Sequence, residues 1–220
     1  MNGRYISLAK SEDSQFHSVE EAIEDIKSNK IVIVVDSIKR ENEGDFICAG
    51  VNVTPEMINF MVTHARGAFI AAFCECGRSE ELGIPPQRTS GENTEANKTR
   101  MMVSVDATAG GSGSSAGDRS LTMNILARKG AVSNELRKPG HVIPIEAVAG
   151  GILERQGHTE AGVELVKLAG INPAVAADLE ILDPDGNMAS REYLFQIAEK
   201  FGLKIINIDQ IISFVRDKTE

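Results

Sequence analysis

Apolar residues recur along the chain with two different spacings, and the alternation of these spacings predicts helices and strands in turn. Between residues 18 and 29, the apolar positions fall on one face of a helix: Val19, Ala22, Ile23 and Ile26. Ser18 and Glu21 have the spacing of a capping box at the start of this helix. The next run, "KIVIVVDS" (30–37), is β-branched, continuously apolar and too short for a helix. It therefore predicts a strand that is covered on both faces.

The same alternation continues to the end of the chain. Helices are predicted over 54–65, 118–130, 159–170, 190–202 and 209–216. Strands are predicted over 67–73, 101–107, 174–182 and 204–208. Thr54 is the predicted N-cap of the first of these helices, and Asp118 that of the second. The polar stretch 85–100 predicts a long loop, which is either a lid over a site or a mobile segment. Together these elements predict one domain of mixed α and β class.

Composition and charge exclude several kinds of partner. The chain has 220 residues and a formal net charge of −9, and no segment concentrates Lys and Arg, which disfavours a general nucleic-acid binder. No apolar run approaches the roughly 18 to 20 residues of a membrane span, and the first residues contain no apolar leader. Three cysteines, two of them in "FCECG", suit reduced thiols better than a disulfide framework or a zinc site. We expect a soluble, cytoplasmic protein without nucleic-acid or membrane partners.

The stretch "KRENEGDF" (39–46) places three carboxylates directly after the predicted strand 30–37: Glu41, Glu43 and Asp45. In an extended segment, side chains two positions apart project to one side, so the three carboxylates repel each other. A cation or basic groups must offset this repulsion. Mg²⁺ takes such oxygen ligands. The alternative is a solvated acidic turn paired with Lys39 and Arg40. The position favours a ligand site, because α/β proteins tend to bind ligands at the carboxyl ends of buried strands.

Two of the four histidines follow a glycine in a basic context that reads as flexible: His141 in "RKPGHVIPI" and His158 in "RQGHTEAGVEL". The second segment stands just before a predicted helix. Backbone N–H groups at that helix N-terminus, the Thr159 hydroxyl and the Arg155 guanidinium could together hold a phosphate. His158 could complete a metal site begun by Glu41, because imidazole and carboxylate are both common ligands.

A Gly/Ser-rich loop offers a competing function. "GSGSSA" (111–116) fits the dinucleotide-binding pattern between a strand and a helix, with Glu135 about 20 residues downstream. The polar segment after the helix does not supply the immediate next strand of a βαβ unit, and no Lys-Ser/Thr pair completes a P-loop. A dinucleotide-binding protein is therefore a weaker hypothesis.

Five motifs within residues 31 to 189 resemble one enzyme family when they are taken together in this order. They are "VVDSIKRENEGD", "SAGDR", "RKPGHVIPIEAVAGG", "ERQGHTEAGVELVKLAGINPA" and "LEILDPDGNMA". The chain resembles the 3,4-dihydroxy-2-butanone 4-phosphate synthases of riboflavin biosynthesis. The resemblance implies one α+β domain over residues 1–220, with a mixed β-sheet covered by helices in layers, and a homodimer with active sites at the interface. Bifunctional relatives carry a GTP cyclohydrolase II domain behind this one, and the chain is expected to end before it.

The resemblance also implies a reaction and a set of site residues. D-ribulose 5-phosphate is converted to L-3,4-dihydroxy-2-butanone 4-phosphate and formate with Mg²⁺, or alternatively Mn²⁺. Glu41 and His158 are the implied metal ligands. The implied substrate-binding residues are Arg40, Glu41, Asp45, Arg155, Gln156, Gly157, His158 and Thr159. The implied catalytic residues are His141, Glu180, Asp36 and Glu43. Carboxylates and imidazole can move protons in such a reaction, while a divalent cation stabilises the enediolate-like anions through which it passes.

Some positions depart from the family pattern. Ile70 stands where the family usually has a cysteine that lines the site, and Gly111, Ser112 and Gly113 replace a Thr-Thr-Gly sequence. A catalytically weakened homologue that binds metal or sugar phosphate is therefore an alternative. The residues that bind metal or move protons keep their types, so we expect an active synthase. We expect Ile70 to cost less activity than the loop changes do, because hydroxyls that bind substrate oxygens are lost from that loop.

Overall fold

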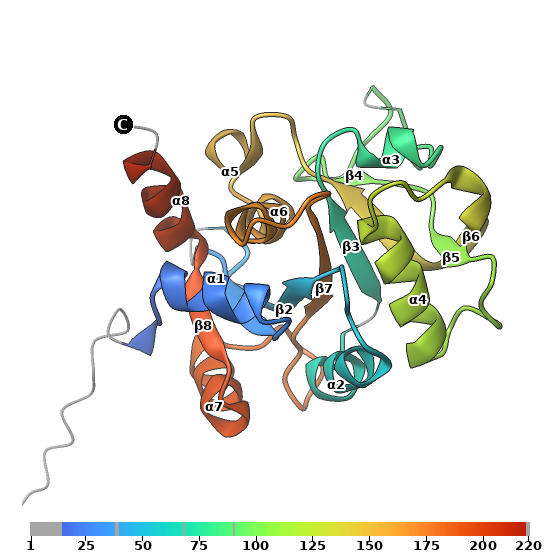
Figure 1. The fold of residues 1–220 in the computed structure, drawn as a ribbon. Helices are drawn as coiled ribbons and strands as arrows, with labels where there is room; N and C mark the ends of the chain where they lie inside the picture. The colour runs from blue at the N-terminus through green and yellow to red at the C-terminus, as the bar shows by residue number, and fades with distance from the viewer. Residues whose placement is uncertain (1–14, 38–39, 68, 90, 219–220) are drawn as a thin grey trace, which may run out of the picture.

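A mixed sheet of eight strands runs through the part of the chain that the structure describes, which is residues 15–37, 40–67, 69–89 and 91–218 (Figure 1). The structure is a computed structural model. The strands are β1 (Val32–Val35), β2 (Gly44–Ala49), β3 (Ile70–Cys74), β4 (Arg100–Met101), β5 (Val105–Ala107), β6 (Leu136–Glu146), β7 (Val175–Glu180) and β8 (Lys204–Asn207). Their order is β4-β6-β3-β7-β2-β1-β8, and β5 pairs with β6. The pairs β1–β8 and β3–β6 are parallel and the others are antiparallel, so the sheet is mixed as expected.

Helices cover both faces of the sheet. They are α1 (Val19–Lys27), α2 (Pro55–Ala65), α3 (Arg78–Glu81), α4 (Ala116–Ala127), α5 (Gly151–Glu154), α6 (His158–Leu168), α7 (Arg191–Phe201) and α8 (Ile208–Asp217). One core contains residues of α2, α4 and α7, and the other contains residues of α1, α6 and α8. Within β1, Val32 and Val34 belong to one core while Ile33 and Val35 belong to the other. This division confirms the layered α+β fold and the prediction of a first strand that is buried on both faces.

Local signals placed most helix ends correctly. Ser18 Oγ accepts the Glu21 N–H at 3.2 Å, and the Glu21 carboxylate accepts the Ser18 N–H at 3.0 Å, which is the predicted capping box. Thr54 caps α2 as expected. The predicted cap of α4 was wrong. Ser115 is its N-cap. Asp118 is the third residue of the helix, and its carboxylate accepts the N–H groups of Gly111 and Gly113 instead.

Strands account for the other corrections. The segment around His141 is not a flexible loop but part of β6, where Gly140 permits a close approach: a Cβ at this position would overlap the backbone of β5. Asp45 lies in β2, and the chain turns before it at Asn42, whose φ is 55°. Residues 40–46 are therefore not one extended stretch, and Lys39 lies outside the described residues. The predicted strand 101–107 divides into β4 and β5.

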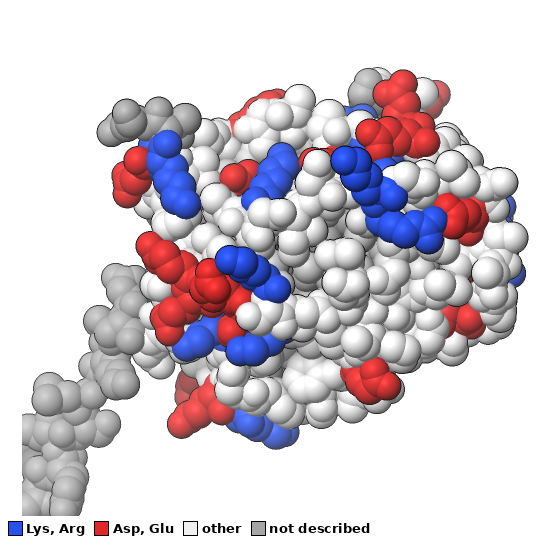
Figure 2. Space-filling view, viewed as in Figure 1, with Lys and Arg blue, Asp and Glu red and all other residues white. Residues whose placement is uncertain are grey.

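The Gly/Ser loop does not belong to a βαβ unit. A strand does follow α4, but β5 and β6 are antiparallel, whereas dinucleotide-binding folds require parallel strands there. On the face drawn in Figure 2, basic side chains lie in small groups beside acidic ones. None of the helices in the described ranges is long and apolar enough to cross a membrane.

Candidate active site

A pocket of about 180 Å³ opens on the face of the sheet that α6 covers. Its lining residues are Arg40, Glu41, Glu43, Asp45, Phe69, Ala71, Phe73, Glu95, Asn97, Thr99, Met101, Ile145, Arg155, His158, Thr159, Asp178 and Glu180. Residues of β2, β3, β6 and β7 form the floor, and the first turn of α6 forms a wall. Gly162 brings α6 close to this floor, since a Cβ there would lie 2.9 Å from the Phe73 ring. The pocket thus joins segments that are far apart in the sequence.

Asp36 organises the loop between β1 and β2. Its carboxylate is fully buried, and it accepts the backbone N–H groups of Glu41 at 3.1 Å and of Glu43 at 2.9 Å. It also accepts a hydrogen bond from Arg40 Nη1 at 3.0 Å, and Arg40 in turn contacts the Glu41 carboxylate. Asp36 is not among the pocket-lining residues. Its bonds nevertheless fix where the acidic side chains of this loop project.

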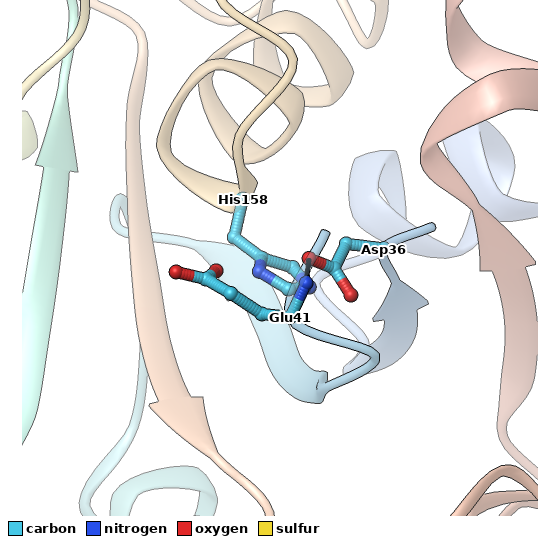
Figure 3. A group of neighbouring side chains, drawn as sticks. All are labelled: Asp36, Glu41 and His158. Carbon is cyan, nitrogen blue, oxygen red and sulfur yellow. Dashed lines mark hydrogen bonds between the residues drawn. The ribbon is translucent and has the colours of Figure 1, made fainter. Parts of the chain in front are cut away.

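Three side chains from two elements converge at one end of the pocket: Asp36, Glu41 and His158 (Figure 3). One potential ligand atom from each lies within 4.8 Å of the other two. His158 is the first residue of α6 and is buried, and its Nε2 has no hydrogen-bond partner among the described residues. Burial lowers the pKa of His158 to about 4, so the imidazole is neutral at physiological pH. Two carboxylates and a neutral imidazole with an unpartnered buried nitrogen form a donor set that fits a divalent cation.

The other carboxyl groups of the pocket are crowded and partly dehydrated. Burial, followed by the charges of Glu41 and Glu180, raises the pKa of Glu43 to about 7. Burial and the charge of Glu41 also raise the pKa of Glu180. Deeper in the pocket, burial raises the pKa values of both Asp45 and Asp178 well above their usual range. The pocket therefore favours protonated carboxyls until a cation or a hydrogen-bonding ligand offsets the repulsion.

The N-terminus of α6 carries an anion-binding arrangement. The Arg155 guanidinium donates from Nη1 to Glu160 Oε2 at 2.6 Å and from Nη2 to Thr99 Oγ1 at 3.0 Å, which holds it at the pocket wall. Gly157 is the N-cap and provides no side chain to bond the free N–H groups of the first turn. Arg155, His158 and Thr159 line the pocket, whereas Gln156 and Gly157 are not among its lining residues. A guanidinium, a hydroxyl and unpaired helix N–H groups together suit a phosphate.

The long loop before β4 closes one side of the pocket. Asn97 Nδ2 donates a hydrogen bond to the Glu41 carboxylate, and Arg155 Nε donates to the Asn97 carbonyl oxygen at 3.4 Å. The Glu95 carboxylate accepts the N–H groups of Asn97 at 2.9 Å and of Thr99 at 2.7 Å, which shapes this tip. The predicted loop 85–100 therefore reaches both a potential metal ligand and the phosphate-binding arginine.

Besides Asp36, Gln156 and Gly157, three further predicted features lie outside the lining of this pocket. His141 is not among the lining residues; its side chain is 46% exposed, and its Nδ1 lies 2.8 Å from Asp106 Oδ2. Ile70 was expected to line the site, and this was wrong. It is fully buried in the core on the opposite face, because neighbouring residues of β3 alternate and the adjacent Phe69 and Ala71 face the pocket. The 111–113 loop is also absent from the lining.

Several lining residues were not predicted from the sequence. Asp178 precedes Glu180 by two positions in β7, so strand alternation alone would have placed both carboxylates on one face. Glu95, Asn97 and Thr99 had no comparable signal, because a long polar loop can pack in many ways. Asp36 was expected to act in catalysis but not to stand among the potential metal ligands.

The fold and site define an α+β protein with an acidic, imidazole-containing pocket on one face of its sheet. The sequence matches the 3,4-dihydroxy-2-butanone 4-phosphate synthase family over residues 20–214. The chain belongs to this family, which confirms the resemblance of its motifs. It is 42% identical over 201 residues to the riboflavin biosynthesis protein RibBA of Bacillus cereus (strain G9842), an alignment that covers 91% of this chain and 50% of RibBA. The chain thus spans about half the length of such relatives.

Two solved structures resemble the fold closely. One is a 3,4-dihydroxy-2-butanone 4-phosphate synthase in complex with two magnesium ions, with a TM-score of 0.86 and 38% identity, over 92% of this chain and 98% of that chain. The other is RibBX, a two-domain 3,4-dihydroxy-2-butanone 4-phosphate synthase from A. baumannii, with a TM-score of 0.85 and 38% identity. That match covers 90% of this chain and 57% of RibBX.

Proposed function

We propose that residues 1–220 act as one synthase domain that converts D-ribulose 5-phosphate to L-3,4-dihydroxy-2-butanone 4-phosphate and formate. The observation that carries this proposal is that Glu41 and His158, which form a potential metal site with the adjacent Asp36, line the same pocket as Arg155. A potential cation site and a phosphate site within one small pocket match the two ends of a sugar phosphate. Mg²⁺ is the proposed cation, with Mn²⁺ as an alternative, because both take carboxylate oxygens as ligands and a similar synthase is solved with two magnesium ions.

Each group has a role that follows from its surroundings. Arg155 and Thr159 bind the phosphate, together with backbone N–H groups of residues 156–159 at the start of α6. Arg40 and Asp45 bind sugar hydroxyls. Glu41 and His158 hold the cation with Asp36, and the cation supplies positive charge that stabilises enediolate-like anions.

Proton transfers fall to the remaining carboxyl groups. With a pKa of about 7, Glu43 exchanges a proton readily near neutral pH, which is the property required of a group that acts as both base and acid. Glu180 lies opposite Asp45 in the β2–β7 pairing and faces the same pocket. Abstraction of a proton beside the ketone and protonation of departing water both need such groups.

We further propose a homodimer in which a second copy of the chain supplies His141. Within one chain, His141 stands on β6 outside the pocket lining, with its ring partly exposed. It precedes Ile143 and Ile145 by two and four positions in β6, so it lies on the same face of the strand, and both isoleucines pack against the core on the pocket side. A second copy that covered this face would bring an imidazole toward the acidic pocket.

The alternatives have less support. The antiparallel pairing of β5 and β6 argues against dinucleotide binding. A catalytically weakened homologue would be expected to show changes inside the pocket, whereas Ile70 lies in the core on the opposite face of the sheet. We also propose a cytoplasmic location, supported by three cysteines that are all free.

Formate release tests the function. Chelator-treated protein should release formate from D-ribulose 5-phosphate only after Mg²⁺ is restored, and Glu41→Gln should release none. Glu199→Gln, which removes an exposed carboxylate on α7, is the matched control and should keep full activity. A wild-type protein that forms no formate in saturating Mg²⁺, or a fully active Glu41→Gln variant, contradicts the proposal.

A further inference from the structure

Asp106 in β5 is a buried carboxylate that lies outside the pocket and binds His141 through both of its oxygens. Oδ1 accepts the His141 backbone N–H at 2.8 Å, and Oδ2 lies 2.8 Å from the ring Nδ1. The Asp106 side chain is only 3% exposed, whereas the His141 ring is 46% exposed. In this pair, the accepting carboxylate of Asp106 is buried, while the imidazole of His141 is partly exposed to solvent.

The surrounding backbone is shaped to hold this pair. A Cβ at Gly113, whose φ is +96°, would overlap the Asp106 carboxylate, and a Cβ at Gly140 would overlap the backbone of Val105 and Asp106. Ser104 Oγ accepts the Gly140 N–H at 3.1 Å, which fixes the residue before His141. Arg137 Nη2 stands 3.7 Å from Asp106 Oδ2, where it balances the charge without forming a short hydrogen bond. Asp106 thus has little freedom to turn away from the imidazole.

This geometry determines which ring nitrogen carries the proton. An ionised carboxylate can only accept hydrogen bonds, so Nδ1 of a neutral His141 donates and Nε2 keeps its lone pair. We infer that Asp106 is the positioning residue for His141 and holds the imidazole in the Nδ1–H tautomer with Nε2 free to take a proton. The consequence for turnover rests on the proposed function, but the tautomer itself does not.

Asp106→Asn makes a specific chemical prediction. The His141 backbone N–H remains a donor, so the amide oxygen of the asparagine stays on it and the amide NH₂ faces Nδ1. Nδ1 must then accept, and the ring hydrogen moves to Nε2. The variant keeps the shape of the site but presents a donor where a base is needed.

Nuclear magnetic resonance of ¹⁵N-histidine-labelled protein measures the tautomer directly. At a pH where the ring is neutral, the ¹⁵N chemical shifts should show a protonated Nδ1 of His141 in the wild type. In Asp106→Asn they should show a protonated Nε2 instead. Asp118→Asn is the matched control: it makes the same carboxylate-to-amide change and replaces one of the two oxygens that accept the Gly111 and Gly113 N–H groups, but Asp118 does not contact the ring. It should retain the wild-type tautomer. An Nε2–H tautomer in the wild type, or no change in Asp106→Asn, overturns the inference.

Turnover provides an independent measurement through a double-mutant cycle. Asp106→Asn should lower kcat by at least about 10- to 100-fold, the range found when the hydrogen-bond partner of a metal-bound histidine is removed, with KM changed less than about twofold. In a His141→Ala background, Asp106→Asn should have no further effect, because its action passes through the ring. An equal loss of kcat in both backgrounds would mean a purely structural role and overturn the inference. If the wild type forms no formate, the proposed function fails, and the tautomer measurement decides the positioning role by itself.

Discussion

Replacing Asp36 by alanine should destabilise the protein as well as inactivate it. The buried carboxylate accepts two backbone N–H groups, from Glu41 and Glu43, and one guanidinium N–H from Arg40. Each donor left without an acceptor costs about 1–3 kcal/mol, and partial hydration of the loop reduces the sum. We therefore expect a loss of about 4 kcal/mol in the free energy of unfolding. For a chain of this size, that loss lowers Tm by roughly 8–16 °C.

Denaturant unfolding in excess chelator separates this effect from loss of a bound cation. Asp25→Ala is the matched control, since Asp25 forms an ion pair with Lys30 at 2.8 Å on the surface, with the Lys30 side chain 62% exposed. The control should lose no more than about 1 kcal/mol. If Asp36→Ala lost as little free energy of unfolding as the control, the Asp36 carboxylate would not organise the loop between β1 and β2. Its hydrogen bonds would then not explain the positions of Glu41 and Glu43.

Three further predictions concern single side chains. Arg155→Lys should lower kcat/KM for D-ribulose 5-phosphate by at least about tenfold, because an ammonium cannot hold Glu160 and Thr99 and also bind a phosphate; Arg216→Lys is the exposed control. Because the pKa of Glu43 is raised from 4.5 to about 7 in the folded protein, its protonated form contributes stability to the metal-free protein. This contribution is complete below pH 4.5 and is lost as the pH rises through about 7. The free energy of unfolding of Glu43→Gln should therefore depend less on pH between 4.5 and about 7 than that of the wild type. Ile70→Cys should cost about 1–3 kcal/mol of stability by leaving a cavity, with kcat nearly unchanged.

Each of these has a clear contrary result. Equal kcat/KM in Arg155→Lys and the wild type would place the phosphate elsewhere. Parallel pH–stability curves for Glu43→Gln and the wild type would mean that Glu43 is hydrated rather than buried among other acids. A large gain of formate release in Ile70→Cys would show that position 70 faces the reacting groups.

The helices and the first buried strand follow from local chemistry, without reference to tertiary contacts. A capping box acts within one turn, so Ser18 and Glu21 define the start of α1 by themselves. The continuous apolarity of β1 likewise requires cover on both faces. Asp118 was predicted to cap α4, but Ser115 caps it, because the Asp118 carboxylate accepts N–H groups of the loop before the helix. The strand β6 was not predicted, because its first half carries exposed polar residues and contains Pro and Gly.

Within the pocket, residue type and spacing identified the acids of the 36–45 segment and the basic start of α6. Their meeting depends on the β1–β2 turn and on the close packing of α6 against β3, neither of which is encoded in a short motif. The contacts of Asn97 with Glu41, and the alternation that turns Ile70 away from the pocket, are likewise settled by packing. The sequence by itself determined which chemical groups this protein carries. Only the tertiary structure decided which of them share a pocket, because burial, pKa and hydrogen-bond partners arise from neighbours that are distant along the chain.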